Sequence, residues 1–298
     1  MIAILGPGGV GGFLAAALIR AREDVQIVAR EPTAELIERT GLDVRSVRLG
    51  DFSVARPTAV PVLDAEADVL VVATKAIGLE GALARIHTPP RLVVPLLNGL
   101  DHMATLRRRF DAVAAGAIRI ESDRPAPGRI VQTSPFLRVD LAADDQALQG
   151  SLRALADMLE RAGVPTQLGP SEAQILWAKL VRLNALALTT SAHDVDVGVI
   201  RTEHRDELEA CIRETAAVAN ADGARIDPAA PLKELDEAHA ELGSSMQRDI
   251  AAGREPELDA IAGSVLRAAA RHGLECPTIA RLAGEVESIR AEARSSAG

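Results

Sequence analysis

The chain has 298 residues and a formal net charge of −9 at pH 7, and aromatic residues make up only 2% of it. The negative charge argues against binding a phosphate backbone, and the scarcity of aromatic rings argues against stacking on single-stranded nucleic acid, so no nucleic-acid partner is expected. The apolar runs are too short to span a bilayer and no signal peptide is recognisable, so no membrane partner is expected either. The two isolated cysteines, Cys211 and Cys276, are typical of reduced thiols and favour a cytoplasmic location.

The first half of the chain alternates short apolar runs with a helical segment. This pattern predicts an α/β domain with a mainly parallel, doubly wound sheet of the Rossmann type and some antiparallel additions. The expected elements are buried strands at 1–5, 25–29, 68–73 and 92–97, a helix at 13–22, a hairpin at 44–56, and strands at 114–121, 129–133 and 136–141.

After about residue 146 the apolar spacing becomes helical, and the last strand-like run is at 164–168. We therefore predict two domains, a nucleotide-binding domain at 1–169 and an all-helical C-terminal domain at 170–298, with a ligand cleft between them. Residues 295–298 resemble a loose tail. The expected helices are at 148–162, 172–191, 202–222, 233–241, 258–272 and 279–294.

A glycine-rich loop follows the first strand and opens the first helix, and it contains the spacing Gly-x-Gly-x-x-Gly. In a dinucleotide site the first glycine makes the tight turn, the second admits the pyrophosphate, and the third lets the helix pack on the strand. The alternative is a purely structural turn. The candidate cofactor-binding residues of this loop are Gly6, Pro7, Gly8, Gly9, Val10 and Gly11.

The end of the second strand bears on the choice of dinucleotide. An acidic residue there would bind the ribose of NAD, whereas an arginine suits the 2′-phosphate of NADP. Arg30 stands at this position, with Glu31 one residue later. We therefore predict NADP (NADPH) as the cofactor; a solvated strand-end cation is the alternative for Arg30.

Only three of the 33 cationic residues are lysines: Lys75, Lys179 and Lys233. Because arginine cannot give up a proton near neutral pH, a rare lysine is a candidate proton donor. Lys75 and Asn98 follow neighbouring predicted strands, whose carboxyl ends line the ligand crevice in this type of fold. The simpler alternatives are a turn at Asn98 and a surface position for Lys179 on its helix.

Taken together, these residues resemble the ketopantoate reductase (2-dehydropantoate 2-reductase) family over almost the full length of the chain. The most specific part is Ser-Ser-Met-Gln-Arg-Asp-Ile at 244–250, followed by Glu-Leu-Asp at 257–259. The other matching segments are the glycine loop at 6–12, Thr-Lys-Ala at 74–76, Asn-Gly at 98–99 and Trp-Ala-Lys-Leu at 177–180.

The resemblance implies an NADPH-dependent reduction of a 2-oxo acid to a 2-hydroxy acid, with 2-dehydropantoate and pantothenate biosynthesis as the leading assignment. It implies that Lys179 is the general acid and Glu257 the second catalytic residue. It also implies that Ser245 and Asn98 contact the substrate, and that Lys75, like Asn98, lies on the cofactor side. Read without the resemblance, Ser245 would be a helix-capping serine and Glu257 an acid of a first helical turn.

One departure concerns the substrate. Family members of the pantothenate pathway are expected to carry asparagines four and eight residues after the catalytic lysine, where this chain has Leu183 and Ala187. Asn184, one position further on, is retained as a substrate-binding candidate. The open alternatives are a paralogous NADP-dependent oxidoreductase acting on another 2-oxo or 2-hydroxy acid, and a non-catalytic NADP-binding protein.

Four further expectations concern the helical domain. The histidines lack metal-like spacing, so no metal site is expected. His193 and Asp194 are expected to form a helix-end pair, with a catalytic dyad as the alternative. Asp249 and Asp259 are expected to be structural, and to pair with Arg248, Arg254 or backbone amides. Apolar helices are compatible with a homodimer.

Overall fold

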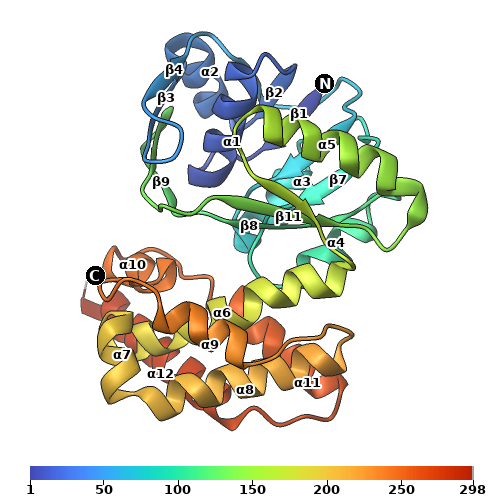
Figure 1. Cartoon of the computed structure of the whole chain (residues 1–298). Helices are drawn as coiled ribbons and strands as arrows, with labels where there is room; N and C mark the ends of the chain where they lie inside the picture. Colours follow the sequence, from blue (N-terminus) through green and yellow to red (C-terminus); the bar gives the residue numbers. More distant parts are fainter. Residues whose placement is uncertain (297–298) are drawn as a thin grey trace. The chain divides into compact units, whose positions relative to one another are not determined.

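Figure 1 shows the computed structural model, which describes residues 1–296. Five short strands pair in parallel to form the main sheet in the first part of the chain. The strand order is β5-β2-β1-β6-β7, and every pairing in it is parallel. This confirms the predicted Rossmann-type sheet. The strands are β1 (Ile2–Leu5), β2 (Val25–Val28), β5 (Thr58–Val60), β6 (Val69–Val72) and β7 (Val93–Pro95).

Two smaller sheets supply the expected antiparallel additions. One has the order β4-β3-β10-β9 and includes the predicted hairpin of β3 and β4; the other has the order β12-β11-β8. The sequence does not predict β9, because Pro125 lies inside it and proline is normally confined to edge strands; β9 is the edge strand of its sheet. These strands are β3 (Leu42–Ser46), β4 (Phe52–Val54), β8 (Ala115–Arg119), β9 (Ser122–Ala126), β10 (Arg129–Gln132), β11 (Arg138–Ala142) and β12 (Thr166–Leu168).

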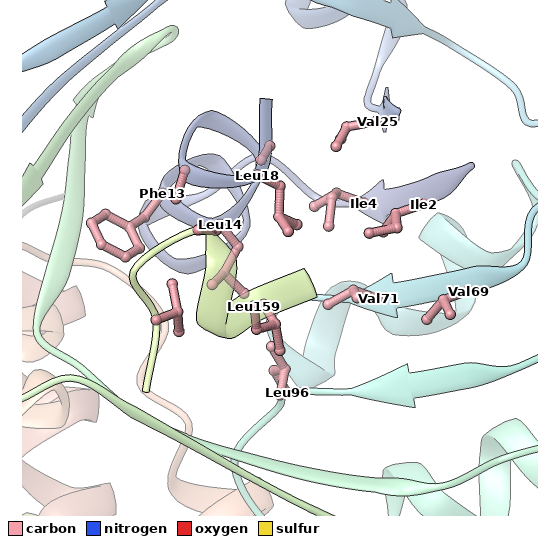
Figure 2. Close-up of a cluster of buried hydrophobic side chains, with 14 of the residues drawn as sticks. Ile2, Ile4, Phe13, Leu14, Leu18, Val25, Val69, Val71, Leu96 and Leu159 are labelled. Carbon is pink, nitrogen blue, oxygen red and sulfur yellow. The ribbon is translucent and has the colours of Figure 1, made fainter. Parts of the chain in front are cut away.

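The core of this part lies between the parallel sheet and helices α1 (Gly9–Arg20) and α5 (Gln149–Arg161). Figure 2 shows Phe13, Leu14 and Leu18 of α1 in one cluster with Ile4 of β1 and Leu159 of α5. Each such side chain, when fully buried, stabilises the fold by about 1.5–3 kcal/mol. The remaining helices here are α2 (Glu31–Thr40), η1 (Ala76–Gly78), α3 (Leu79–Leu83), α4 (His102–Arg107) and η2 (Gln146–Leu148).

After β12 the described residues form helices and connecting loops, with no further strand, as predicted. The predicted helix at 202–222 is interrupted at His204, and the predicted helix at 258–272 begins with a π-helical turn. The helix α10 was not predicted. These elements are α6 (Glu172–His193), α7 (Val197–Glu203), α8 (Arg205–Ala221), α9 (Ala229–Asp236), α10 (Ser245–Ala251), η3 (Asp259–Gly263), α11 (Ser264–Arg271) and α12 (Pro277–Ser296).

The chain divides into two compact units. The first unit comprises Met1–Leu97 and His102–Ile175, and the second comprises Asn98–Asp101 and the chain from Leu176 onwards. The division falls within α6, and the boundary at residues 169 and 170 stays a prediction. Of the predicted tail, residues 295–296 belong to α12 and residues 297–298 lie outside the described part. Among the described helices, none has the length and apolar character needed to cross a membrane.

Candidate functional site

The three motif glycines of the loop between β1 and α1 each have the geometry expected of a dinucleotide site. Gly6 has a φ of +91°, in the left-handed region that favours glycine. A Cβ added to Gly8 would meet open space, so a ligand can approach the backbone there. A Cβ on Gly11 would lie 2.2 Å from the backbone oxygen of Gly6, so only glycine permits this close packing of helix on strand.

The start of α1 offers hydrogen-bond donors to an anion. Its first intrahelical bond runs from the amide of Gly12 to the oxygen of Gly8, at 2.8 Å. The amides of Gly9, Val10 and Gly11 precede that bond, and such amides at a helix N-terminus bind phosphate groups well. Pro7 is buried and has no amide hydrogen to offer. The loop therefore fits the pyrophosphate of a dinucleotide.

Ser122 of β9 fixes the loop from outside, and the sequence did not indicate it. Its Oγ donates a hydrogen bond to the backbone oxygen of Gly9 at 2.8 Å. A Cβ on Gly9 would lie only 2.1 Å from the backbone oxygen of Ser122, so the loop and β9 touch backbone to backbone. The two residues are 113 positions apart, and no local pattern marks the contact.

The other cofactor candidates of the first unit are exposed cations. Arg30 follows β2 and occupies the N-cap position of α2, and Glu31 is the first residue of that helix. Lys75 lies three residues beyond β6 and precedes η1. The geometry leaves both cationic side chains accessible to an anionic ligand.

Asn98 and Glu257 are joined directly within the second unit. The Nδ2 group of Asn98 donates a hydrogen bond to Oε2 of Glu257 at 2.9 Å, and both side chains are half-buried. Two candidates that are 159 positions apart in the sequence therefore share one site.

The backbone next to this pair is closely packed against a neighbouring segment of the chain. Gly99 has a φ of +83°, and a Cβ there would lie 1.9 Å from the backbone oxygen of Ala260, which belongs to the π-helical turn η3. Glu257 lies two residues before η3, and the amide of Ile261 within that turn bonds to the backbone oxygen of Glu257 at 3.0 Å. Single π turns are frequent at functional sites because they shift the side chains of a helix relative to its axis.

Lys179 lies on α6 and is half-buried. Leu183, one helical turn later, is also half-buried, whereas Ala187 is buried at 1% exposure. Asn184 is completely buried, and its Nδ2 donates to Oγ1 of Thr215 on α8 at 3.0 Å. The amide of Asn184 therefore serves the contact between α6 and α8 in this structure.

The two serines at the start of α10 have different places. Ser244 is the N-cap: its Oγ accepts the amide of Gln247 at 3.1 Å, and the hydroxyl of Thr190 donates to it at 2.9 Å. Ser245 is the first residue of the helix and is exposed. The N-cap role that the sequence alone suggests for Ser245 therefore belongs to Ser244.

Two of the acidic residues near this site have structural partners. Asp249 pairs with Arg254 at 2.8 Å, as expected. Asp259 pairs instead with Arg267, at 2.7 Å, which also binds Asp101 at 2.6 Å. The sequence does not indicate the pairing of Asp259 with Arg267, because Arg267 comes eight residues later, on the following helix α11.

Comparison with known families shows which family the chain belongs to. The model of the ketopantoate reductase PanE/ApbA family matches residues 2–143, and the model of the C-terminal part of that family matches residues 173–290.

The chain belongs to the ketopantoate reductase family.

Relatives of this family match nearly end to end. The 2-dehydropantoate 2-reductase of Caulobacter vibrioides is 28% identical over 295 residues, which cover 93% of this chain and 94% of the relative. The structure of 2-dehydropantoate 2-reductase from Geobacter metallireducens is 26% identical, has a TM-score of 0.88, and covers 96% of this chain and 99% of its own.

A D-mandelate dehydrogenase, solved with NADH and anilino(oxo)acetate, also has a TM-score of 0.88, and covers 98% of this chain and 99% of its own. Its identity is 19%, so this likeness shows the fold alone.

Membership of the ketopantoate reductase family makes this chain a nicotinamide-dependent oxidoreductase that acts on a CH–OH group and reduces a 2-oxo acid. Its candidate residues form two sets. The glycine loop, Arg30 and Lys75 belong to the first unit. Asn98, Lys179, Asn184, Ser245 and Glu257 belong to the second.

Proposed function

We propose that this chain reduces a 2-oxo acid with NADPH, with 2-dehydropantoate as the leading substrate and Lys179 as the general acid. The observation that supports it most is the hydrogen bond between Asn98 and Glu257. It joins two residues that the family resemblance assigns to substrate binding and catalysis. The intact geometry of the glycine loop supports the binding of a dinucleotide.

The chemistry requires a proton donor near the carbonyl group of the substrate. When bound, the nicotinamide cofactor supplies a hydride to C2 of the 2-oxo acid. The carbonyl oxygen must then receive a proton. The ammonium group of Lys179 polarises this oxygen and donates the proton, and the neutral amine recovers a proton from solvent. An arginine could polarise the carbonyl group but would donate poorly.

Asn98, Glu257 and Ser245 orient the substrate in this proposal. A carboxylate only accepts hydrogen bonds, so Glu257 holds the hydroxyl group of the 2-hydroxy acid through its oxygen. Asn98 fixes that carboxylate through its amide. The exposed hydroxyl of Ser245 donates to the substrate carboxylate.

NADPH is the proposed cofactor because of Arg30. Its guanidinium follows the second strand of the parallel sheet and is exposed, where a 2′-phosphate can accept from it. The neighbouring carboxylate of Glu31 acts against this preference, so the discrimination between the two dinucleotides is expected to be modest.

The test is a steady-state assay of NADPH and NADH oxidation with a panel of 2-oxo acids that includes 2-dehydropantoate and phenylglyoxylate. The proposal predicts turnover of at least one of them, with a higher kcat/KM for NADPH. An absence of turnover, with NADPH still binding, would instead support a non-catalytic NADP-binding protein.

A second candidate substrate class is favoured by Leu183 and Ala187. Both positions are apolar where the family resemblance leads us to expect asparagines, and the amide of nearby Asn184 is engaged by Thr215. We therefore keep a paralogous reductase for 2-oxo acids with apolar side chains as the alternative. A kcat/KM for phenylglyoxylate above that for 2-dehydropantoate would select it; phenylglyoxylate is the oxidised form of mandelate, and a D-mandelate dehydrogenase shares this fold.

A further inference from the structure

Two histidines and a glutamate meet at the end of α6. His193 is the last residue of α6, His204 lies at the break between α7 and α8, and Glu207 is in the first turn of α8. The three potential ligand atoms all lie within 4.8 Å of one another. His193 ends α6 and Asp194 follows it directly, as expected of a helix-end pair, and Nε2 of His193 lies 2.6 Å from Oε2 of Glu207.

The second imidazole is the feature that a simple ion pair does not explain. The rings of His193 and His204 are stacked, with their centroids 3.6 Å apart and their planes inclined by 16°. Nδ1 of His204 lies 4.0 Å from the same oxygen of Glu207. That distance is too long for a hydrogen bond. Two ring nitrogens therefore lie near one carboxylate oxygen that bonds to only one of them.

The ligand types and their spacing suit a divalent transition metal. Imidazole nitrogen and carboxylate oxygen are typical zinc ligands, and catalytic and exchangeable sites are often completed by water. At bond lengths of about 2.0–2.2 Å, tetrahedral ligands stand roughly 3.3–3.5 Å apart. The three candidate atoms lie within 4.8 Å of one another, so their side chains would have to draw together to hold an ion. His204 is the N-cap residue of α8 and Glu207 lies three residues later in its first turn, so both lie at the start of that helix.

The surroundings orient the carboxylate and favour a cation. Nη2 of Arg281 donates to the other oxygen of Glu207 at 2.6 Å, which leaves Oε2 directed to the histidines. Arg281 also pairs with Glu285 at 2.7 Å, so one guanidinium is shared by two carboxylates and a net negative charge remains.

We infer that His193, His204 and Glu207 form a binding site for a divalent transition-metal ion of the zinc class. The three side chains are 22%, 29% and 26% exposed, so an ion can reach them. His193 lies fourteen residues after Lys179 on the same helix, roughly 21 Å along its axis. The site is therefore separate from the proposed general acid. A bound ion would join the end of α6 to the start of α8. To bind the ion through Nε2, the imidazole of His193 would carry its proton on Nδ1.

The test uses untagged, full-length protein freed of metals with a chelator and titrated with cobalt(II), a spectroscopic substitute for zinc. We expect visible d–d absorption that saturates at a single equivalent. His193→Gln and His204→Gln should each weaken binding at least tenfold, as loss of a ligand does. His272→Gln is the matched control, because His272 also pairs with a carboxylate, Asp222, at 2.8 Å, and it should bind cobalt(II) like the unaltered chain.

A second readout does not depend on the spectrum or on enzymatic activity. Zinc(II) should raise the Tm of the unaltered chain and of His272→Gln, but not that of His204→Gln, because an ion that binds only the folded state stabilises it. Circular dichroism checks that the variants fold. The inference is wrong if no saturable absorption develops, if both histidine variants bind cobalt(II) unchanged, or if a sulfur-to-cobalt charge-transfer band assigns the ion to Cys211 instead.

Discussion

The amide of Asn98 and the carboxylate of Glu257 form a 2.9 Å hydrogen bond next to a close backbone contact made by Gly99. Gly99 follows Asn98, has positive φ, and lies against the backbone of Ala260 in the π-helical turn that begins two residues after Glu257. The two polar side chains thus lie next to this backbone contact.

We expect Gly99→Ala to lower both stability and kcat/KM. The added Cβ would lie 1.9 Å from the oxygen of Ala260, and alanine is strained at a φ of +83°, which together should cost about 1–3 kcal/mol. Gly253→Ala is the matched control, because Gly253 has a φ of +65° but open space around its Cβ position. Thermal denaturation and steady-state kinetics of the two variants would be compared; an equal loss in both would show that the contact with Ala260 is unimportant.

Lys179→Ala should lower kcat by about 10²–10⁴-fold, the usual contribution of a general acid, while the Kd for NADPH changes little. Lys179→Arg should recover little of the rate, since a guanidinium keeps its proton. Lys233→Ala is the control, because Lys233 is exposed and pairs only loosely with Glu237, at 3.7 Å. Steady-state kinetics measure kcat, and a fluorescence titration with NADPH measures the Kd. Near-normal turnover in Lys179→Ala would remove Lys179 from the mechanism.

Arg30→Ala should reduce kcat/KM for NADPH roughly ten- to hundredfold, which matches the loss of a charge-assisted hydrogen bond of ~1.5–3 kcal/mol. The value for NADH should change little, because NADH has no 2′-phosphate. Arg39→Ala is the control, since Arg39 is also an exposed cation of α2. If Arg30→Ala lowers kcat/KM equally for NADPH and for NADH, Arg30 does not select the cofactor.

Asp222 should contribute stability that acid removes. Burial would raise its pKa, but hydrogen bonds from His272 and from the indole of Trp177 lower it overall, below its ordinary value of 3.8. A depressed folded pKa means that this stability is present above pH 3.8 and is lost as the pH falls through the folded value. Asp222→Asn should therefore lower the Tm by a few degrees at pH 7, and the difference should shrink in acid.

The fluorescence of Trp177, the only tryptophan, reports this unfolding, and Asp206→Asn is the control at an exposed position. A difference in Tm that stays constant down to the acid range would contradict the assignment to the carboxylate of Asp222.

The local signals in the sequence were sufficient for the parallel sheet and for the glycine loop. The buried runs at Ile2–Leu5 and Val69–Val72 are almost wholly apolar because both faces of the sheet are covered, and a glycine motif after a strand has few alternatives. Contacts between residues far apart in the chain could not be predicted from the sequence. Ser122 contacts Gly9 from β9, a strand that is hard to recognise because it contains Pro125. The family resemblance points to Asn98 and Glu257 but does not indicate that they form a hydrogen bond.

The cluster around Glu207 was missed for a similar reason. The spacing of histidines along the chain predicts no metal site, and this stays a prediction. His193 and His204 nevertheless meet, because the chain turns between α6 and α8. The sequence also gives no sign of the π-helical turn η3, because Asp259–Gly263 lies within one continuous run of helical spacing at 258–272.

The substrate preference can be tested at Leu183. If the apolar side chain of Leu183, one turn after Lys179, excludes 2-dehydropantoate, then Leu183→Asn should raise kcat/KM for this substrate about tenfold or more, because an amide would supply a hydrogen bond that leucine cannot. Leu183→Ala is the matched control, since it removes the apolar wall without adding an amide. Leu183 is half-buried, so the exchange should be tolerated by the fold. If Leu183→Asn and Leu183→Ala raise kcat/KM for 2-dehydropantoate equally, the space at this position, and not a hydrogen bond, limits the use of this substrate. If the unaltered chain already prefers 2-dehydropantoate and Leu183→Asn lowers kcat/KM, then Leu183 belongs to a site adapted to that substrate.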